Sequence, residues 1–303
     1  MSASDDVSGN LKTIGDIIRW GVNQFEVADL SYGHGTDNAH DEAAWLLAHA
    51  LHYALPLEDS DLGLRLTAQD KNKVLGLFDA RIKTRKPAAY LTHEAWFAGY
   101  SFYVDERVLV PRSPIAEMIK DGFQPWAGLL VIERILDIGT GSGCIAIACA
   151  HRFPGALVDA ADISPAALEV TRINIEMHNL ENRVSAIESD LFSALGDNSY
   201  DLIVSNPPYV SRKEMESLPG EYRHEPVTGL AAGEDGLDAV NRIFHEASRY
   251  LKNDGILVLE VGDRQDEIMD QYSRIEMMWP EFVSGGGGIL VASRAELSKL
   301  RKL

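Results

Sequence analysis

The sequence predicts an α/β fold in which a parallel β-sheet carries helices on both faces and follows a small helical domain. Three observations predict it. Short apolar strands alternate with helical stretches after residue 113, one strand runs directly into a glycine-rich loop, and the first 90 residues show helical periodicity. Alternation of this kind is typical of parallel sheets, because a helix usually makes the crossover between parallel strands. A chain of 303 residues has room for two domains of about 150 residues each.

The helical domain, expected within residues 1–92, is predicted from apolar residues that recur every three or four positions. Such a stripe gives each helix one apolar face for a core. Three segments show it: Leu11, Ile14, Ile18, Gly21, Val22 and Phe25; Ala43, Trp45–Leu47 and Ala50–Leu51; and Val74, Leu77, Phe78 and Ile82.

A connecting β-hairpin is predicted for residues 93–112. Residues 96–110, WFAGYSFYVDERVLV, are rich in aromatic and β-branched side chains, and an Asp-Glu-Arg run is expected at the tip. The segment ends in Pro111-Arg112, a natural hinge, and the sheet domain then spans residues 113–303.

The sheet domain contains five short apolar segments that we expect to be strands. They are RILDIG, ALVDAAD, VSAIESD, YDLIVSN and GILVLEVG. Near the end of the chain, MMWPEFV and GILVASR are expected to close the sheet as an antiparallel pair, separated by Gly285–Gly288. Consecutive glycines make a flexible turn, and we assign them no chemistry.

The chain is strongly acidic, and its charge is unevenly distributed. The formal net charge is −18. Residues 1–60 hold ten Asp/Glu against Lys12 and Arg19, whereas residues 61–112 hold nine Lys/Arg against six acids. An acidic field repels phosphate backbones and favours basic partners, although acidity also serves solubility alone. We therefore expect the helical domain to recognise a basic substrate, with no sequence-specific nucleic acid as a partner.

Both cysteines, Cys144 and Cys149, are expected to be buried free thiols, because their spacing on one helix points them in different directions. The first ten residues lack a basic stretch followed by an apolar core, and no apolar run approaches the length of a membrane span. We expect no secretory signal, no membrane partner and a cytoplasmic location. The nine histidines show no ligand spacing, so we expect no metal.

A glycine-rich loop joins the strand RILDIG to the helix IAIACAHRF. Gly139, Gly141 and Gly143 permit a tight turn and a close approach of a ligand to the backbone. A phosphate-binding loop would end in Gly-Lys-Ser/Thr, and this loop has no lysine. A dinucleotide fingerprint would place its third glycine where Cys144 stands.

The loop instead resembles that of class I (Rossmann-like) methyltransferases, which implies S-adenosylmethionine as cofactor. Asp137 would then face the methionine ammonium group, Asp162 the ribose hydroxyls, and Asp190 the adenine amine with Leu191 beside the ring. A single aspartate is more often a helix cap or turn former, but three of them end successive strands here. The residues expected to bind the cofactor are Asp137, Gly139, Thr140, Gly141, Ser142, Gly143, Asp162, Asp190, Leu191 and Asn206.

The fourth strand leads into Asn206-Pro207-Pro208-Tyr209. Two prolines also stiffen an ordinary turn, but beside a cofactor loop they favour a methyl-acceptor site. The side-chain oxygen of Asn206 and the carbonyl of Pro207 can accept both hydrogens of a planar NH2 group and so orient its nitrogen. Tyr209 offers a flat face. We expect Asn206, Pro207 and Tyr209 to be catalytic, and all four residues to bind substrate.

These motifs together resemble two groups, the amino-methyltransferases of adenine or guanine and the protein glutamine methyltransferases. The second group also has a helical domain, a hairpin and a VPR segment, here VLVPRSPIAE at 108–117. Its release-factor branch typically reads PRPxTE. The departure from that pattern and the segment EYRHEPVTGLAAGEDGLD at 221–238 are similar to the branch that modifies the third protein of the large ribosomal subunit. The resemblance covers nearly the whole chain and implies methylation of a glutamine amide nitrogen in that basic protein.

Two alternatives stay open. A nucleic-acid amino-methyltransferase needs nearly the same acceptor clamp but must bind a polyanion, which the net charge disfavours. The basic run RIKTRK at 81–86 is in its favour, though that run could instead touch ribosomal RNA. A non-catalytic binding module is disfavoured because both motifs are intact. The long segment 211–238 beside the acceptor motif is expected to contact substrate through Tyr222, Arg223, His224 and Glu225.

Overall fold

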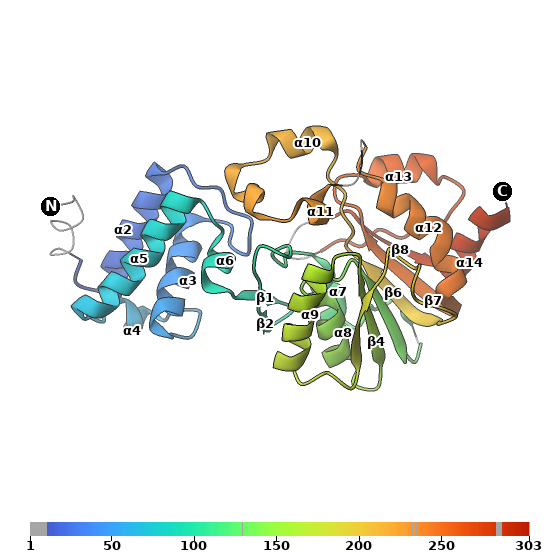
Figure 1. Ribbon diagram of the computed structural model, residues 1–303, viewed down its shortest axis with the longest axis horizontal. Coiled ribbons are helices and arrows are strands. Elements are labelled where there is room, and N and C mark those ends of the chain that lie inside the picture. Colours follow the sequence, from blue (N-terminus) through green and yellow to red (C-terminus); the bar gives the residue numbers. More distant parts are fainter. Residues whose placement is uncertain (1–10, 129, 232, 234, 283–286, 303) are drawn as a thin grey trace. The chain divides into compact units, whose positions relative to one another are not determined.

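The computed structural model describes residues 11–128, 130–231, 233, 235–282 and 287–302 (Figure 1). The chain divides into two compact units. The helical unit is the chain up to Glu94 together with Pro219–His224, and the sheet unit is Ala95–Leu218 together with Glu225–Leu303. The hairpin region therefore groups with the sheet, and a short segment from the second half of the chain groups with the helices.

The helical unit is built on helices that pack through aromatic side chains. Its helices are α2 (Ile14–Val27), α3 (Ala39–Leu51), α4 (Asp59–Leu62), α5 (Ala68–Thr84) and α6 (Ala88–Thr92). Thr13 and Asp16 begin α2 with a capping box, in which each side chain accepts the other's backbone N–H. Phe25 and Phe78 are fully buried and meet edge to face at 5.2 Å. Gly21 permits this packing, because a Cβ there would collide with the Phe78 ring.

The basic run at 81–86 does not form a free cationic patch. Arg81 is fully buried and pairs with Glu42 and Glu221, while Lys83 pairs with Asp79 at 2.7 Å. A guanidinium that is neutralised inside the protein cannot reach a phosphate. The expectation that this run could touch RNA is therefore wrong for Arg81.

The hairpin is confirmed, but its tip lies elsewhere than expected. Strands β1 (Ala95–Phe97) and β2 (Tyr100–Phe102) pair antiparallel, and Ala98 and Gly99 form the turn with positive φ values of 52° and 92°. Two positive φ values are typical of tight hairpin turns. The Asp-Glu-Arg run follows the hairpin and makes its own turn, in which Asp105 accepts hydrogen bonds from the backbone and side chain of Arg107.

The sheet confirms the predicted fold class. Its strands are β3 (Arg134–Ile138), β4 (Leu157–Asp162), β5 (Val184–Glu188), β6 (Tyr200–Ser205), β7 (Leu251–Glu260) and β8 (Ile289–Ser293). They lie in the order β5-β4-β3-β6-β7-β8, and all neighbours are parallel except β7 and β8. The strand order reverses direction between β3 and β6. Ligands of open α/β sheets bind at such a switch point, outside the carboxyl ends of the strands.

Helices cover both faces of the sheet. Those of the sheet unit are α7 (Ile115–Lys120), α8 (Cys144–Arg152), α9 (Pro165–Met177), α10 (Arg212–Ser217), α11 (Val227–Leu230), α12 (Asp238–Tyr250), α13 (Gln265–Gln271) and α14 (Arg294–Leu297), with 3-10 turn η2 (Ser298–Lys302), while η1 (Gly220–His224) belongs to the helical unit. Successive strand residues alternate between two cores: Ile135 joins the core with α7 and α8, and Leu136 joins the core with α12 and α13. Cys144 and Cys149 are buried free thiols in the first core, as predicted.

The predicted closing pair is shorter than expected. Strand β8 pairs antiparallel with β7, whereas the preceding segment contributes a single antiparallel bridge between Met278 and Val291. Of the predicted glycine turn, Gly285 and Gly286 lie outside the described residues. Gly288 is described, and it packs so closely on Gly262 that a Cβ there would collide with the backbone.

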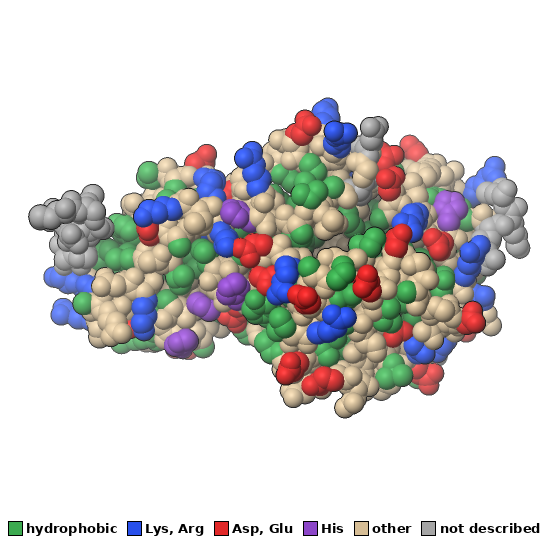
Figure 2. All heavy atoms as spheres, in the orientation of Figure 1, with side chains coloured by type: hydrophobic (Ala, Val, Ile, Leu, Met, Phe, Trp, Pro, Cys, Tyr) green, Lys and Arg blue, Asp and Glu red, His purple; other side chains and the backbone are tan. Residues whose placement is uncertain are grey.

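Charges of both signs are interspersed on the face shown in Figure 2, and the described side chains drawn there form no continuous basic field. Within the described residues, no helix has the length and apolar character needed to cross a membrane.

Candidate active site

The glycine loop between β3 and α8 adopts a backbone that favours glycine. Gly139, Gly141 and Gly143 have φ values of 71°, 56° and 82°, all in the left-handed region. A Cβ at Gly143 would lie 3.0 Å from the side chain of Thr171, whereas a Cβ at Gly141 would enter open space. Gly143 therefore lets α9 pack against the loop, and Gly141 leaves the outer side of the loop accessible to a ligand.

Asp137 lies buried beneath this loop. Its Oδ2 accepts hydrogen bonds from Thr140 Oγ1 at 2.6 Å and from the Ala146 N–H at 3.1 Å. Its Oδ1 is buried and has no hydrogen-bond partner among the described residues. Burial raises the pKa of Asp137 to about 7. A cation or a hydrogen-bond donor supplied by a ligand would satisfy the second oxygen, which fits the ammonium group of S-adenosylmethionine.

Asp162 joins the end of β4 to the glycine loop. Its Oδ2 accepts the Gly141 N–H at 2.9 Å, and its Oδ1 accepts the Ser164 N–H at 2.9 Å. Each carboxylate oxygen has two acceptor sites, so both can still receive a hydroxyl. Burial raises the pKa of this carboxyl. Its position beside Gly141 fits the two hydroxyls of a ribose.

Asp190 and Leu191 follow β5. Asp190 is exposed, and its Oδ1 accepts a hydrogen bond from Arg242 of α12 at 2.8 Å. Arg242 was not expected from the sequence, because only the tertiary fold brings α12 to this strand end. Leu191 has a φ of 52° and packs partly buried against the core. A branched residue in this conformation is strained, and such strain is concentrated at functional sites.

The acceptor motif lies next to the glycine loop. Ser205, the last residue of β6, donates a hydrogen bond to the Ile138 carbonyl at 2.7 Å and so ties β6 to the end of β3. A Cβ at Gly139 would lie 3.9 Å from the Asn206 carbonyl oxygen. Asn206 is partly exposed, and Pro207 is buried. The fold thus brings together the glycine loop and the acceptor motif, which are more than 60 residues apart in the sequence.

Tyr209 is held in one position by groups that sequence reasoning missed. Its hydroxyl donates to Glu260 Oε1 at 3.1 Å, and Ser113 Oγ donates to the other oxygen of Glu260. A Cβ at Gly262 would lie 2.6 Å from the Tyr209 ring, and one at Gly236 would lie 2.5 Å from its carbonyl oxygen. Glu260 ends β7, as Asp162 ends β4, and that shared position is the signal that could have identified it.

The VPR segment contacts the far end of the loop that follows the acceptor motif. Arg112 donates two hydrogen bonds to Glu225, at 2.6 and 2.8 Å, and the Val110 N–H donates a third at 3.2 Å. Glu225 is buried. Arg112 is part of a family motif in the sequence. In the structure it pairs with Glu225, the residue at which the chain re-enters the sheet unit.

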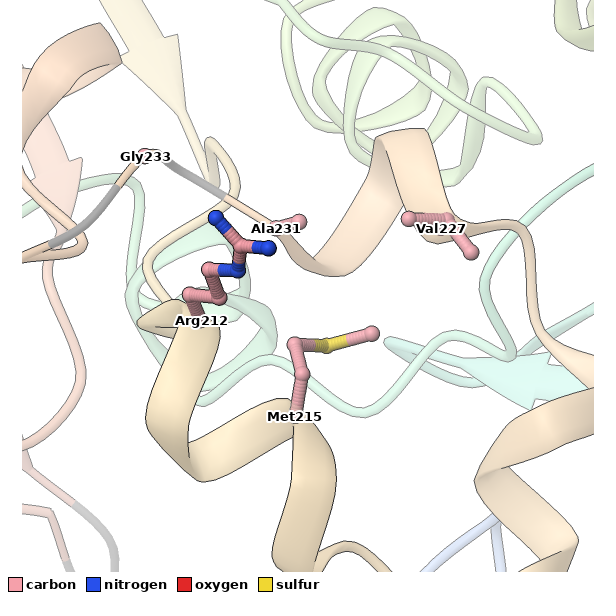
Figure 3. A pocket seen from close by; sticks show the side chains of 5 residues that line it. All are labelled: Arg212, Met215, Val227, Ala231 and Gly233. Carbon is pink, nitrogen blue, oxygen red and sulfur yellow. The ribbon is translucent and has the colours of Figure 1, made fainter.

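A hollow of about 380 Å³ lies beside the acceptor motif in the sheet unit. Its walls come from α10, α11 and the residues after α11: Arg212, Met215, Val227, Ala231 and Gly233 (Figure 3). The Val210 N–H, directly after the motif, donates to the Leu230 carbonyl at 3.0 Å. Val210 also forms a β-bridge with Ala231, and the Arg212 N–H donates to the Gly233 carbonyl at 3.2 Å, so the segment that follows the acceptor motif forms part of the wall of the hollow.

Most of the residues expected to contact substrate in this loop make contacts within the protein. The centroids of the Tyr222 and His34 rings lie 4.4 Å apart, and His224 Nε2 lies 2.9 Å from the Thr84 carbonyl oxygen. Arg223 is exposed. Three of the four residues expected to contact substrate therefore contact other parts of the protein.

Comparisons with known proteins agree with this geometry. The family model described as Methyltransferase small domain matches residues 129–219. A ribosomal protein uL3 glutamine methyltransferase of Neisseria meningitidis serogroup B is 45% identical over 288 residues, which cover 95% of this chain and 95% of that protein. A protein with the same description from Bordetella pertussis is 45% identical over 289 residues, which cover 95% and 97%.

The fold also occurs in more distant structures. The crystal structure of the hMettl16 catalytic domain in complex with MAT2A 3'UTR hairpin 6 matches with a TM-score of 0.50 and 18% identity, over 77% of this chain and 85% of that chain. This likeness concerns the fold alone. The 45% identity to the two curated relatives extends over nearly the whole chain. The chain therefore belongs to the family of ribosomal protein uL3 glutamine methyltransferases, which depend on S-adenosylmethionine.

Proposed function

We propose that this chain methylates the side-chain amide nitrogen of a glutamine in ribosomal protein uL3. The observation that supports this best is the acceptor motif at the end of β6, held against the glycine loop at the switch point of the sheet. When bound, S-adenosylmethionine supplies an electrophilic methyl group. The target protein is the one that names the 45% identical relatives.

The residues proposed to hold the cofactor surround the glycine loop. Asp137 would take the ammonium group on its free oxygen, and the loop from Gly139 to Gly143 would lie against the ligand. Asp162 would accept the ribose hydroxyls beside Gly141. Asp190 and Leu191 would meet the adenine at the end of β5.

The acceptor residues perform their task by orientation. An amide NH2 is a weak nucleophile because its lone pair is delocalised into the carbonyl. The Asn206 oxygen and the Pro207 carbonyl accept its two hydrogens and stabilise the positive charge that develops on the nitrogen. Pro208 and Tyr209 give the planar group a fixed wall, and the hydrogen bond from Tyr209 to Glu260 keeps that wall in place.

The charge of the enzyme suits such a substrate. A ribosomal protein that binds RNA carries excess positive charge, and this chain has a net charge of −18, so their encounter is electrostatically favourable. Substrate recognition by the helical unit and a cytoplasmic location are part of the proposal. A nucleic-acid base is the less favoured acceptor, because the basic run that supported it contains a buried arginine.

The test uses purified enzyme, S-adenosylmethionine and isolated uL3, with methylated peptides identified by mass spectrometry. Asn206→Ala should lower turnover by about two to three orders of magnitude, by analogy with the loss of one oxyanion-hole contact, and should leave cofactor affinity nearly unchanged. Asn182→Ala, at an exposed turn, is the matched control. Wild-type turnover by Asn206→Ala would place the acceptor site elsewhere.

A further inference from the structure

The chain enters the helical unit twice. The residues up to Glu94 form its helices, and Pro219–His224, which we call the strap, joins them from the loop after the acceptor motif. Both flanks of the strap belong to the sheet unit. The polypeptide therefore passes between the units at three points, two of them at the ends of the strap.

A buried glutamate anchors the strap. Glu221 is fully buried, and its Oε1 accepts the Ser31 N–H at 3.0 Å and lies 3.4 Å from Arg81 and 2.8 Å from Arg85. Arg81 is itself fully buried and also donates to Glu42 at 2.7 Å. The carboxylate of one segment thus sits between two arginines of another, with Glu42 as a second anion.

Two further strap residues contact the helical unit. Tyr222 packs on His34, and His224 lies within hydrogen-bond distance of the Thr84 carbonyl. The next residue, Glu225, is back in the sheet unit and is held there by Arg112. The strap is therefore fixed inside the helical unit, and its exit is fixed inside the sheet unit.

The strap connects the two helices that wall the hollow beside the acceptor motif. Helix α10, which carries Arg212 and Met215, ends just before the strap, and α11, which carries Val227, begins just after it. In Figure 3 these side chains converge on one space from the two helices. Because the strap is short, fixing its conformation limits the distance between the end of α10 and the start of α11.

Stability alone does not account for this arrangement. A buried ion pair often stabilises a protein no more than apolar side chains of similar size, and in some proteins its role is to select one geometry. The other carboxylate oxygen of Glu221 is buried and lacks a hydrogen-bond partner among the described residues, so the pairing is incomplete. The Glu221 carboxylate is costly to bury and only partly hydrogen-bonded. Its role is therefore better explained by its positioning of the strap than by a gain in stability.

We propose that Glu221 is a positioning residue for methyl transfer to protein substrates. By fixing the conformation of the strap, it limits the distance between α10 and α11, whose side chains wall the hollow, so that the chain flanking the target glutamine is bound in one pose. For its substrate, this proposal rests on the proposed function. Cofactor binding, which depends on the glycine loop, does not require Glu221.

The experiment compares Glu221→Gln with Glu216→Gln, an exposed position on α10 of the same loop. With intact uL3, Glu221→Gln should raise KM by about tenfold with kcat nearly unchanged, which is the signature of lost uniform binding. Affinity for S-adenosylmethionine, measured by calorimetry, should match the wild type. Amides of α10 and α11 should exchange hydrogen faster than in the wild type, because their connection is no longer anchored. Glu216→Gln should behave like the wild type throughout.

Three results would overturn the proposal: kinetics for Glu221→Gln equal to those of Glu216→Gln, unchanged exchange in α10 and α11, or a loss of cofactor affinity that parallels a fall in Tm. If Glu221→Gln does not fold, Arg85→Gln replaces it, since the Arg85 side chain is 36% exposed. That variant should show a smaller rise in KM and the same local exchange, and wild-type values would contradict the proposal. The exchange measurement needs no substrate. It therefore still tests the anchor if uL3 proves not to be the substrate.

Discussion

Asp137 and Asp162 both bind the glycine loop, yet the protein leaves them in different environments. Asp137 is fully buried and has one oxygen without a partner among the described residues, whereas Asp162 is partly exposed and accepts two backbone N–H groups. The first is suited to a cation that replaces water completely. The second is suited to hydroxyls at the edge of the site. The sequence motif identifies both residues only as acids. Their different burial in the structure suits them to different groups of the ligand.

The raised pKa of Asp137 predicts how the stability of the protein depends on pH. Its folded-state pKa of about 7 lies above the ordinary 3.8, so the native state holds the extra proton between these values. The resulting stabilisation is present at low pH and is lost as the pH rises through 7. The free energy of unfolding should fall by up to about 1.4 kcal/mol per pH unit in this window, relative to Asp137→Asn. Denaturant titrations of both proteins measure this difference, and parallel curves would contradict the assigned burial.

At the scale of elements, the glycines of the loop between β3 and α8 have distinct roles. Gly143 faces α9, where a side chain would press on Thr171, and Gly141 faces open space. Both have positive φ values, so replacing either by alanine incurs a backbone penalty. Packing adds to that penalty at Gly143. At Gly141 an added methyl group would instead obstruct a ligand.

Gly141→Ala and Gly143→Ala should therefore fail in different ways. Each should lose about 1–2 kcal/mol from the left-handed conformation alone, and Gly143→Ala should lose more because its Cβ would lie 3.0 Å from Thr171. Gly141→Ala should show the larger loss of affinity for S-adenosylmethionine relative to its loss of stability. Calorimetry and thermal unfolding of the two variants separate these effects. Wild-type affinity in Gly141→Ala would exclude a ligand over this residue.

The elements also show what could be predicted from sequence. The strand entering the glycine loop and the motif at Asn206 were predictable, because their signals are local and the topology of a parallel sheet brings strand ends together. The hairpin tip was placed at the wrong turn, because the Asp-Glu-Arg run forms a turn of its own stabilised by Asp105. Glu260 shares its strand-end position with Asp162 and could have been noticed there, but its hydrogen bonds to Tyr209 and Ser113, like the ion pairs of Glu221, could not be predicted. Their partners are distant in sequence, and no local pattern records such pairs.

At the scale of the whole molecule, each of the two units is compact by itself, but neither is formed by one continuous stretch of sequence. The strap places six residues of the acceptor-side loop in the unit formed by the start of the chain. The loop that follows the acceptor motif is therefore connected at both ends of the strap to the unit proposed to recognise the substrate. A short glutamine peptide would depend less on that link than an intact ribosomal protein.

The central claim is that the acceptor is a glutamine of uL3. Its most direct test is to incubate the enzyme and labelled S-adenosylmethionine with lysate from cells that lack the enzyme, and then to identify the labelled macromolecule. The acidic charge and the buried Arg81 disfavour a polyanion, and the curated relatives indicate uL3. The label should therefore appear on uL3, at a glutamine side chain, and should disappear with Asn206→Ala. Preferential labelling of ribosomal RNA or DNA would contradict the account.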